Sequence, residues 1–250
     1  KKEYSTKRRT SIENAEEAVY EEKKMEETEV CFLMDRFGYC RTVDVPTFER
    51  NRDAALTENK YVIQCMNTDR LCLFTDAGHM HMIKVSALPY GKFRDKSIPI
   101  DNFGNYNSSE ESLVYVDCLT NVIGSRLLFA TGQAMFKQVN GEEFNVSKRT
   151  IASTKLSDND KAVLPLSDAT HVALRTKNGI FLRFDINEVP EKKKAALGVR
   201  GIKLSGDDMV DEVYLLAKNG EMIITYNDKS ISLNKLKLGH RDTKGTKLRI

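Results

Sequence analysis

The sequence predicts an all-β protein of the propeller type, built from about five copies of a four-stranded blade, with six as the alternative count. Two observations support this prediction. An apolar strand, a turn and an alternating strand recur along the chain, and a Lys-Leu marker recurs in step with them. Two features that repeat in phase about every 45 residues indicate repeated structural units rather than unrelated hairpins.

The clearest copy of the repeat lies at residues 170–190. Residues 171–176 form a short strand with an apolar centre (VAL), residues 177–179 (KNG) form a turn, and residues 180–185 alternate between apolar and polar. Asn-Gly between two such strands predicts a two-residue turn, because both turn residues must accept a positive φ. The other copies begin at residues 30, 71, 127 and 213, so the predicted turn glycines are Gly38, Gly78, Gly132, Gly179 and Gly220.

The repeat defines one β domain at residues 30–250, preceded by a connector at residues 1–29. The connector is basic at first and then strongly acidic, which is typical of a flexible linker or a short exposed helix. The chain lacks an initiating Met, which indicates a piece of a longer protein, and its polar, basic start is unlike a signal peptide. No apolar run approaches the ~20 residues that span a bilayer. We therefore expect a cytoplasmic location.

Cysteine usage argues against both disulfides and a thiolate metal site. The number of cysteines is odd, and none of them form a Cys-x-x-Cys pair. Buried thiols in a reducing cytosol are the simplest interpretation. The residues concerned are Cys31, Cys40, Cys65, Cys72 and Cys118.

The sequence lacks four common catalytic and nucleotide-binding motifs. It lacks a phosphate-binding Gly-x-x-x-x-Gly-Lys-Ser/Thr loop, a Gly-x-Gly-x-x-Gly after a strand, a His-Glu-x-x-His motif and a Gly-x-Ser-x-Gly nucleophile. His79 and His81 share one face of a strand and could bind a metal with a third ligand. A solvated strand face near a turn is the favoured interpretation. We expect no catalytic residue, no metal and no cofactor in this chain, and no enzymatic activity of its own.

Basic residues recur in phase with the repeat, and this pattern favours nucleic-acid binding. Residues 229–250 also carry seven Lys or Arg against one acidic residue. Equivalent positions of successive blades lie along one perimeter, where a bent duplex would meet about one cation per blade and release counterions. Lys and Arg also protect strand edges, so the interpretation depends on the whole set. The predicted DNA-binding residues are Arg41, Lys84, Lys137, Lys155, Arg183, Arg200, Lys203, Arg241, Lys244 and Lys247.

Several stretches together resemble the C-terminal domain of the A subunit of bacterial type IIA DNA topoisomerases, the family of gyrase and topoisomerase IV. They are residues 75–78 (TDAG) leading to Lys84 and to residues 87–89 (ALP), residues 175–179 (RTKNG) and residues 198–204 (GVRGIKL). Residues 4–10 (YSTKRRT) are similar to the place where the family's catalytic core ends. The resemblance covers nearly the whole chain.

The resemblance implies a β-pinwheel, a propeller-like ring whose blades exchange strands, with DNA bent around a basic outer rim. It also implies a holoenzyme of paired A and B subunits that passes one duplex through another with ATP and Mg²⁺. The catalytic tyrosine and the ATPase would then lie outside this chain. The implied partners are double-stranded DNA, the rest of the A subunit, which this chain continues, and the B subunit, in the nucleoid and not at a membrane.

One departure from the family bears on function. Gyrase A subunits carry a box of glutamine, arginines, glycines and lysine between the first two hairpins. Here residues 46–60 contain no glycine, and only Arg50 and Arg52 could be remnants of that box. The expected function is therefore that of the topoisomerase IV-like domain, positioning the transported duplex. A gyrase wrapping domain is the first alternative, and a propeller that serves as a protein-interaction platform is the second.

Overall fold

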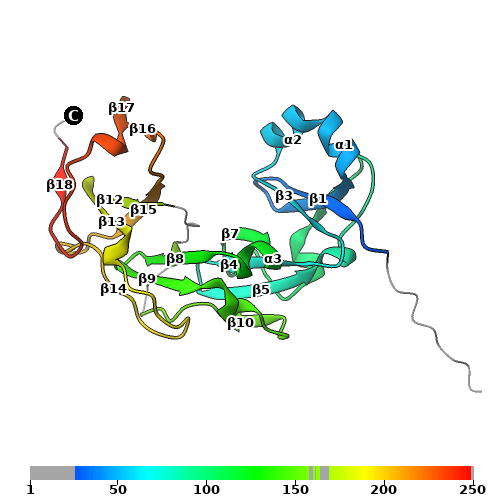
Figure 1. Ribbon diagram of the computed structural model, residues 1–250, viewed down its shortest axis with the longest axis horizontal. Coiled ribbons are helices and arrows are strands. Elements are labelled where there is room, and N and C mark those ends of the chain that lie inside the picture. Colours follow the sequence, from blue (N-terminus) through cyan, green and yellow to red (C-terminus); the bar gives the residue numbers. More distant parts are fainter. Residues whose placement is uncertain (1–25, 158–159, 161, 164–168, 249–250) are drawn as a thin grey trace, which may run out of the picture.

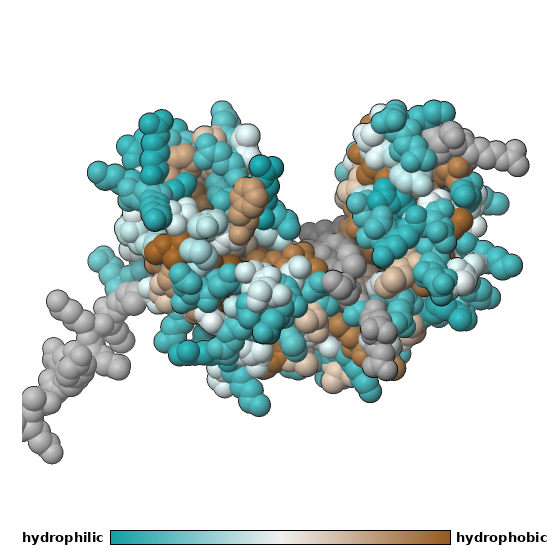
Figure 2. Space-filling view, turned by 180° about the vertical axis from the view of Figure 1, so that it is seen from behind, coloured by the Kyte–Doolittle hydropathy of each residue, from teal (hydrophilic) through white to brown (hydrophobic). Residues whose placement is uncertain are grey.

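The computed structural model is an open crescent of small twisted sheets, with the first and last sheets at its two ends (Figure 1). It describes residues 26–248 apart from residues 158–159, 161 and 164–168. The space-filling view shows the two ends apart, with hydrophilic side chains over much of this face (Figure 2). Residues 1–25 of the expected connector lie outside the described residues. Within the described ranges, no helix is both long and apolar enough to cross a membrane.

The first four hairpins form where the repeated pattern predicts them. All of their strands are six residues long and pair in antiparallel fashion. The all-β prediction is therefore confirmed. The hairpins are β1 (Glu29–Met34) with β2 (Tyr39–Asp44), β4 (Arg70–Thr75) with β5 (His79–Lys84), β8 (Arg126–Thr131) with β9 (Met135–Asn140), and β12 (His171–Thr176) with β13 (Ile180–Asp185).

The hairpin turns differ from the prediction in two details. Gly38, Gly78 and Gly179 adopt a positive φ, but in the third hairpin Ala134 (φ 63°) does so, two residues after the expected Gly132. Asn178 does not adopt a positive φ. The N–H of Gly179 donates to the carbonyl of Thr176 at 2.9 Å, so residues 177–179 form a three-residue turn that ends in one left-handed residue.

We expect Gly78→Ala to lower the free energy of unfolding by about 1–2 kcal/mol. The backbone there has φ 77°, and an added methyl group would lie 3.2 Å from the carbonyl oxygen of Thr154 and 3.1 Å from Leu156. Urea unfolding measures the change. Gly206→Ala is the matched control, because its φ (58°) is also positive but no atom lies within 4 Å of the added methyl group. Equal losses in the two variants would show that crowding at Gly78 contributes nothing.

Each of the four sheets includes one strand that comes after the next hairpin in the sequence. In the first sheet, β3 (Tyr61–Met66) pairs with β1, whereas β6 (Ile98–Pro99) pairs with β2 only after the chain has passed through β4 and β5. The next three sheets repeat this topology, which is the strand exchange expected of a β-pinwheel. We call the strand that pairs with the first strand of a hairpin, as β3 does, the outer strand, and the one that pairs with the second, as β6 does, the exchanged strand. In these three sheets the outer strands are β7 (Leu113–Cys118), β11 (Ala162–Val163) and β15 (Val210–Leu216). The exchanged strands are β10 (Thr150–Ala152), β14 (Val199–Arg200) and β18 (Thr246–Lys247).

The fifth copy of the repeat differs from the predicted hairpin at residues 213–220. That stretch begins within β15, the outer strand of the fourth sheet. The last hairpin is instead β16 (Ile223–Tyr226) with β17 (Lys229–Ser232). Its turn residues Asn227 and Asp228 both have a positive φ, so the two-residue turn expected at residues 178–179 occurs here. The described residues thus form four four-stranded sheets and this two-stranded one.

Short helices and 3₁₀ turns occupy several of the segments between the strands. α1 (Val45–Arg50) begins after Asp44, whose carboxylate accepts the N–H of Thr47 at 2.5 Å, and Pro46 lies in its first turn. Both are ordinary helix-start signals. The other described helices are α2 (Arg52–Glu58) and α3 (Leu119–Ile123), with 3₁₀ turns η1 (Val85–Ala87), η2 (Ile100–Phe103), η3 (Gly141–Phe144), η4 (Ile186–Glu188) and η5 (Leu233–Lys235).

The hydrophobic core lies between neighbouring sheets. Along β4, Leu71 and Leu73 pack toward the first sheet, while Cys72 and Phe74 pack toward the third. Successive strand residues point to opposite faces, so a sheet in the middle of the crescent buries both. The five cysteines are free and buried, as predicted. Burial raises the pKa of Cys65 to about 12, which keeps this thiol protonated at neutral pH.

Candidate nucleic-acid interface

Two of the predicted arginines are bonded to backbone carbonyls of distant loops. Arg41 on β2 donates from Nη1 to the carbonyl of Asp95 at 2.5 Å, and its guanidinium lies over the ring of Phe93. Arg183 on β13 donates from Nη1 to the carbonyl of Leu236 at 3.3 Å. Both side chains are half-buried. They hold the chain segments that lead to the exchanged strands β6 and β18.

Lys137 on β9 lies inside the fold and is only 2% exposed. Its ammonium donates to the carbonyls of Lys194 at 2.5 Å and Ala196 at 2.8 Å, and lies 3.5 Å from that of Lys193. Burial lowers the pKa of Lys137 to about 8. The structure places this ammonium away from solvent, so we do not include it in the proposed interface.

Arg41, His81 and Lys137 occupy the same position in three successive hairpins, three residues after the left-handed turn residue. Each reaches the segment that brings in an exchanged strand: His81 Nδ1 lies 3.0 Å from Oγ1 of Thr150 on β10. Side chains at this position therefore hold the exchanged strands in place. The equivalence of the three positions was not visible in the sequence, because the third turn was aligned on Gly132 instead of Ala134.

Five of the predicted cations come together beside the fourth sheet. The segments after β14 and before β18 run side by side, since the N–H of Lys203 donates to the carbonyl of Thr243 at 2.8 Å and that of Asp242 to the carbonyl of Gly201 at 2.7 Å. We call this group the C-terminal basic surface. It consists of Arg200, Lys203, Arg241, Lys244 and Lys247.

The members of the C-terminal basic surface differ in exposure. The side chains of Lys203, Lys244 and Lys247 are exposed. Arg200 is also exposed and forms an ion pair with Asp242, and the hydrogen bond from Arg200 holds the pKa of Asp242 below its usual value. Arg241 is half-buried and donates from Nε to the carbonyl of Glu188 at 2.9 Å. Three ammonium groups and one paired guanidinium therefore face solvent together.

A neighbouring cavity of about 420 Å³ extends this positive region. Lys244 and Arg183 line it together with Lys235 and Lys237. The last two residues were not predicted from the sequence, although they lie in the same basic stretch, residues 229–250.

A second basic group lies on the second sheet. Lys84 is directly opposite Arg70 in the β4–β5 register, and both line a cavity of about 170 Å³ with Arg149. Like charges opposite each other destabilise a sheet unless an anion compensates them. We call Arg70, Lys84 and Arg149 the central basic surface. Lys155 is exposed and follows β10 on the same sheet.

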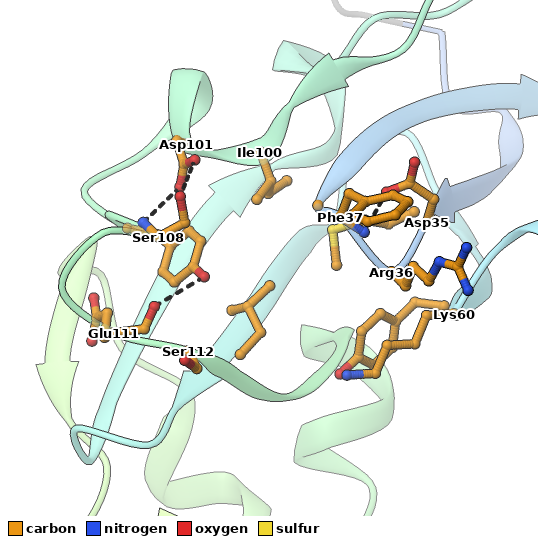
Figure 3. Close-up of a pocket in the computed structure, with 14 residues that line it drawn as sticks. Asp35, Arg36, Phe37, Lys60, Ile100, Asp101, Ser108, Glu111 and Ser112 are labelled. Atoms are coloured by element: carbon orange, nitrogen blue, oxygen red, sulfur yellow. Dashed lines mark hydrogen bonds between the residues drawn. The ribbon is translucent and has the colours of Figure 1, made fainter.

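A further cavity, of about 270 Å³, lies between parts of the first and second sheets and is lined by residues of both charge signs (Figure 3). Figure 3 shows Ser108 beside Asp101, to which it donates from its backbone N–H at 3.0 Å and its hydroxyl at 2.8 Å. Arg36 and Lys60 lie on the other side of the cavity, near Asp35. Because its charges are mixed, this cavity does not extend either basic surface.

Comparison with known proteins agrees with the resemblance seen in the sequence. Residues 125–165 and 171–214 match the family described as "DNA gyrase C-terminal domain, beta-propeller". The A subunit of DNA gyrase from Ureaplasma parvum serovar 3 is 26% identical over 236 residues, which cover 87% of this chain and 28% of that protein. The A subunit of DNA topoisomerase 4 from Streptococcus pyogenes serotype M3 is 27% identical over 175 residues, which cover 66% of this chain and 21% of that protein. The chain is similar to the C-terminal domains of type IIA topoisomerase A subunits.

Solved structures of this family share the fold. The C-terminal domain of DNA topoisomerase IV has a TM-score of 0.77 at 20% identity, over 88% of this chain and 72% of that one. The E. coli ParC C-terminal domain has a TM-score of 0.70 at 17% identity, over 89% and 94% of the two chains. The DNA gyrase A C-terminal domain has a TM-score of 0.58 at 15% identity, over 87% and 76%. The chain spans less than a third of the curated relatives named above.

Proposed function

We propose that this chain binds double-stranded DNA along its basic surfaces and bends it, as the DNA-binding domain at the C-terminus of a topoisomerase IV-like enzyme's A subunit. The observation that carries the proposal is the C-terminal basic surface, where Lys203, Lys244 and Lys247 are exposed beside Arg200 and Arg241. Exposed cations grouped in this way neutralise phosphates, and the released counterions drive binding without regard to base sequence.

The topology supports a single path for the duplex. Lys84 lies on the second strand of its hairpin, and Arg149, Lys203 and Lys247 lie in or next to exchanged strands that pair with such second strands. These cations therefore belong to the same edge of successive sheets. A duplex that follows this edge around a crescent must bend, at a cost on the order of 1–6 kcal/mol for 20–30 bp. Several phosphate contacts offset that cost.

The topoisomerase IV-like assignment rests on residues 46–60. This stretch forms α1 and α2 and contains no glycine, in place of the glycine-containing box of gyrase. In the proposed holoenzyme the domain positions the transported duplex in the cytoplasmic nucleoid. The rest of the A subunit, the B subunit, ATP and Mg²⁺ carry out strand passage. A gyrase-like wrapping domain would instead give a strong change of linking number when nicked circles are ligated with the chain bound.

The first test is a salt series with the whole chain and a random-sequence duplex of about 40 bp, read by fluorescence anisotropy. With about six phosphate contacts, log affinity should fall linearly with log salt, with a loss on the order of 1,000-fold between about 50 and 200 mM. No binding at about 50 mM would contradict the proposal and would favour a protein-interaction platform.

A further inference from the structure

Three potential metal ligands converge beside the second sheet, outside both basic surfaces. His79 and His81 come from β5, and Glu111 lies just before β7. Nε2 of His81 is 2.5 Å from Oε1 of Glu111, and Nδ1 of His79 is 3.1 Å from Oε2. One donor atom from each of the three residues lies within 4.8 Å of the other two.

The histidines do not form the solvated strand face expected from the sequence. His81 is 4% exposed and the side chain of Glu111 only 8% exposed, whereas the side chain of His79 is 49% exposed. A carboxylate enclosed in this way requires hydrogen-bond donors or a cation beside it. Lys60 and Arg36 lie on the opposite side of the 270 Å³ cavity from Glu111, and the Glu111 carboxylate points away from them (Figure 3). The nearby histidines are therefore its immediate polar partners, together with Thr75, whose hydroxyl donates to Oε2 at 2.6 Å.

A second layer of contacts orients the three ligands. Nδ1 of His81 lies 3.0 Å from Oγ1 of Thr150, which also accepts from Nδ2 of Asn105 at 3.0 Å. The ring of Tyr106 packs edge-on against His81, and its hydroxyl donates to the carbonyl of Glu111 at 3.2 Å. A hydrogen bond at Nδ1 fixes the tautomer of an imidazole and leaves Nε2 free for a metal, as in many zinc sites.

We propose that His79, His81 and Glu111 bind one Zn²⁺ ion. Two imidazoles and a carboxylate are typical zinc ligands at about 2.0–2.2 Å in a tetrahedral arrangement, and the three donors here already lie within 4.8 Å of one another. Ca²⁺ and Mg²⁺ are disfavoured because they take oxygen ligands. Because the side chain of His79 is exposed, water could supply a fourth ligand.

The proposed ion would join parts of the chain that are far apart in sequence. It links β5 to the segment before β7, and through His81 and Thr150 it also supports β10, the strand that returns from the third hairpin. Metal bound in this way stabilises the folded chain by an amount that grows with free zinc concentration. Its role would be to hold β10 and the segment before β7 against β5 in the second sheet.

The test is zinc binding by the whole chain, stripped with a chelator and assayed without DNA, so that its result is independent of the proposed function. Competition with a chromophoric chelator should give one Zn²⁺ per chain and a zinc-dependent rise in Tm, and Co²⁺ should give the visible absorption of a tetrahedral site. His79→Gln and Glu111→Gln should each weaken zinc binding at least 10-fold. His240→Gln is the control, because His240 is also an exposed histidine beside a carboxylate, that of Glu188 at 3.2 Å, but lies outside the proposed site.

Loss of the zinc in His79→Gln with retention in His240→Gln would support the site. Equal zinc binding in both variants, or no stoichiometric binding by the unaltered chain, would overturn it. If circular dichroism shows that Glu111→Gln fails to fold, the exposed His79 variant decides the question alone.

Discussion

Lys137→Ala is expected to lower the free energy of unfolding by about 3–5 kcal/mol. The substitution removes a buried ammonium from the carbonyls of Lys194 and Ala196 and leaves a cavity beside Phe129, whose ring lies 5.3 Å from Nζ. Each unpaired buried carbonyl costs about 1–3 kcal/mol. Urea unfolding, with the slope of the transition compared as well as its midpoint, measures the loss.

Lys84→Ala is the matched control for Lys137→Ala. Lys84 also lies on the second strand of a hairpin but is exposed, so its substitution should change stability by only about 0.5 kcal/mol. Lys137→Met, which fills most of the space without donating a hydrogen bond, should fall between the two. Similar stability of Lys137→Ala and Lys84→Ala would show that Lys137 does not hold the segment at residues 193–196.

Replacing Lys203 and Lys244 together with Ala is expected to weaken DNA binding about 10–100-fold at ~0.1 M salt and to flatten the salt slope by about two. Both side chains are exposed on the C-terminal basic surface, so each loss removes a phosphate contact without disturbing the core. The effect should be the same for duplexes of different sequence, because phosphate contacts carry no base information. Anisotropy titrations at several salt concentrations provide both quantities.

Lys60→Ala with Lys218→Ala is the control pair for DNA binding. Both lysines are exposed, but they adjoin the outer strands β3 and β15 rather than the exchanged strands. This pair removes the same charge from the opposite edge of the sheets and should leave the salt slope nearly unchanged. Equal effects of the two pairs would mean that total charge, and not a defined edge, determines binding.

The first four hairpins were predictable from the sequence because each carries its own local signal. Apolar strands flank a turn, and Gly38, Gly78 and Gly179 supply the left-handed residue. Strand exchange was accessible only through the family resemblance, because an exchanged strand such as β6 has two residues and no periodicity of its own. The helix α1 carries start signals at Asp44 and Pro46, but its six residues are too few for a helical periodicity to show in the sequence.

The candidate site was predictable only in part, for a similar reason. The C-terminal cations form a dense run in the sequence, so their grouping followed from charge counting. The central basic surface was missed because Arg70 and Arg149 approach Lys84 only through strand pairing and the fold of the second sheet. Burial of Lys137 depends on carbonyls at residues 193–196, more than fifty positions away, and no local pattern reveals such partners.

Strand exchange also has a consequence for synthesis on the ribosome. The first sheet cannot be completed until Ile98 and Pro99 have emerged, by which time β4 and β5 have already left the exit tunnel. Each newly made hairpin therefore waits with an open edge until the following one has appeared. Folding of the nascent chain would advance as a staggered series, in which every added unit closes the sheet before it and leaves its own edge open. A ribosome that stalls between two hairpins would present an unfinished edge to neighbouring chains, which is the geometry that favours swapping between copies.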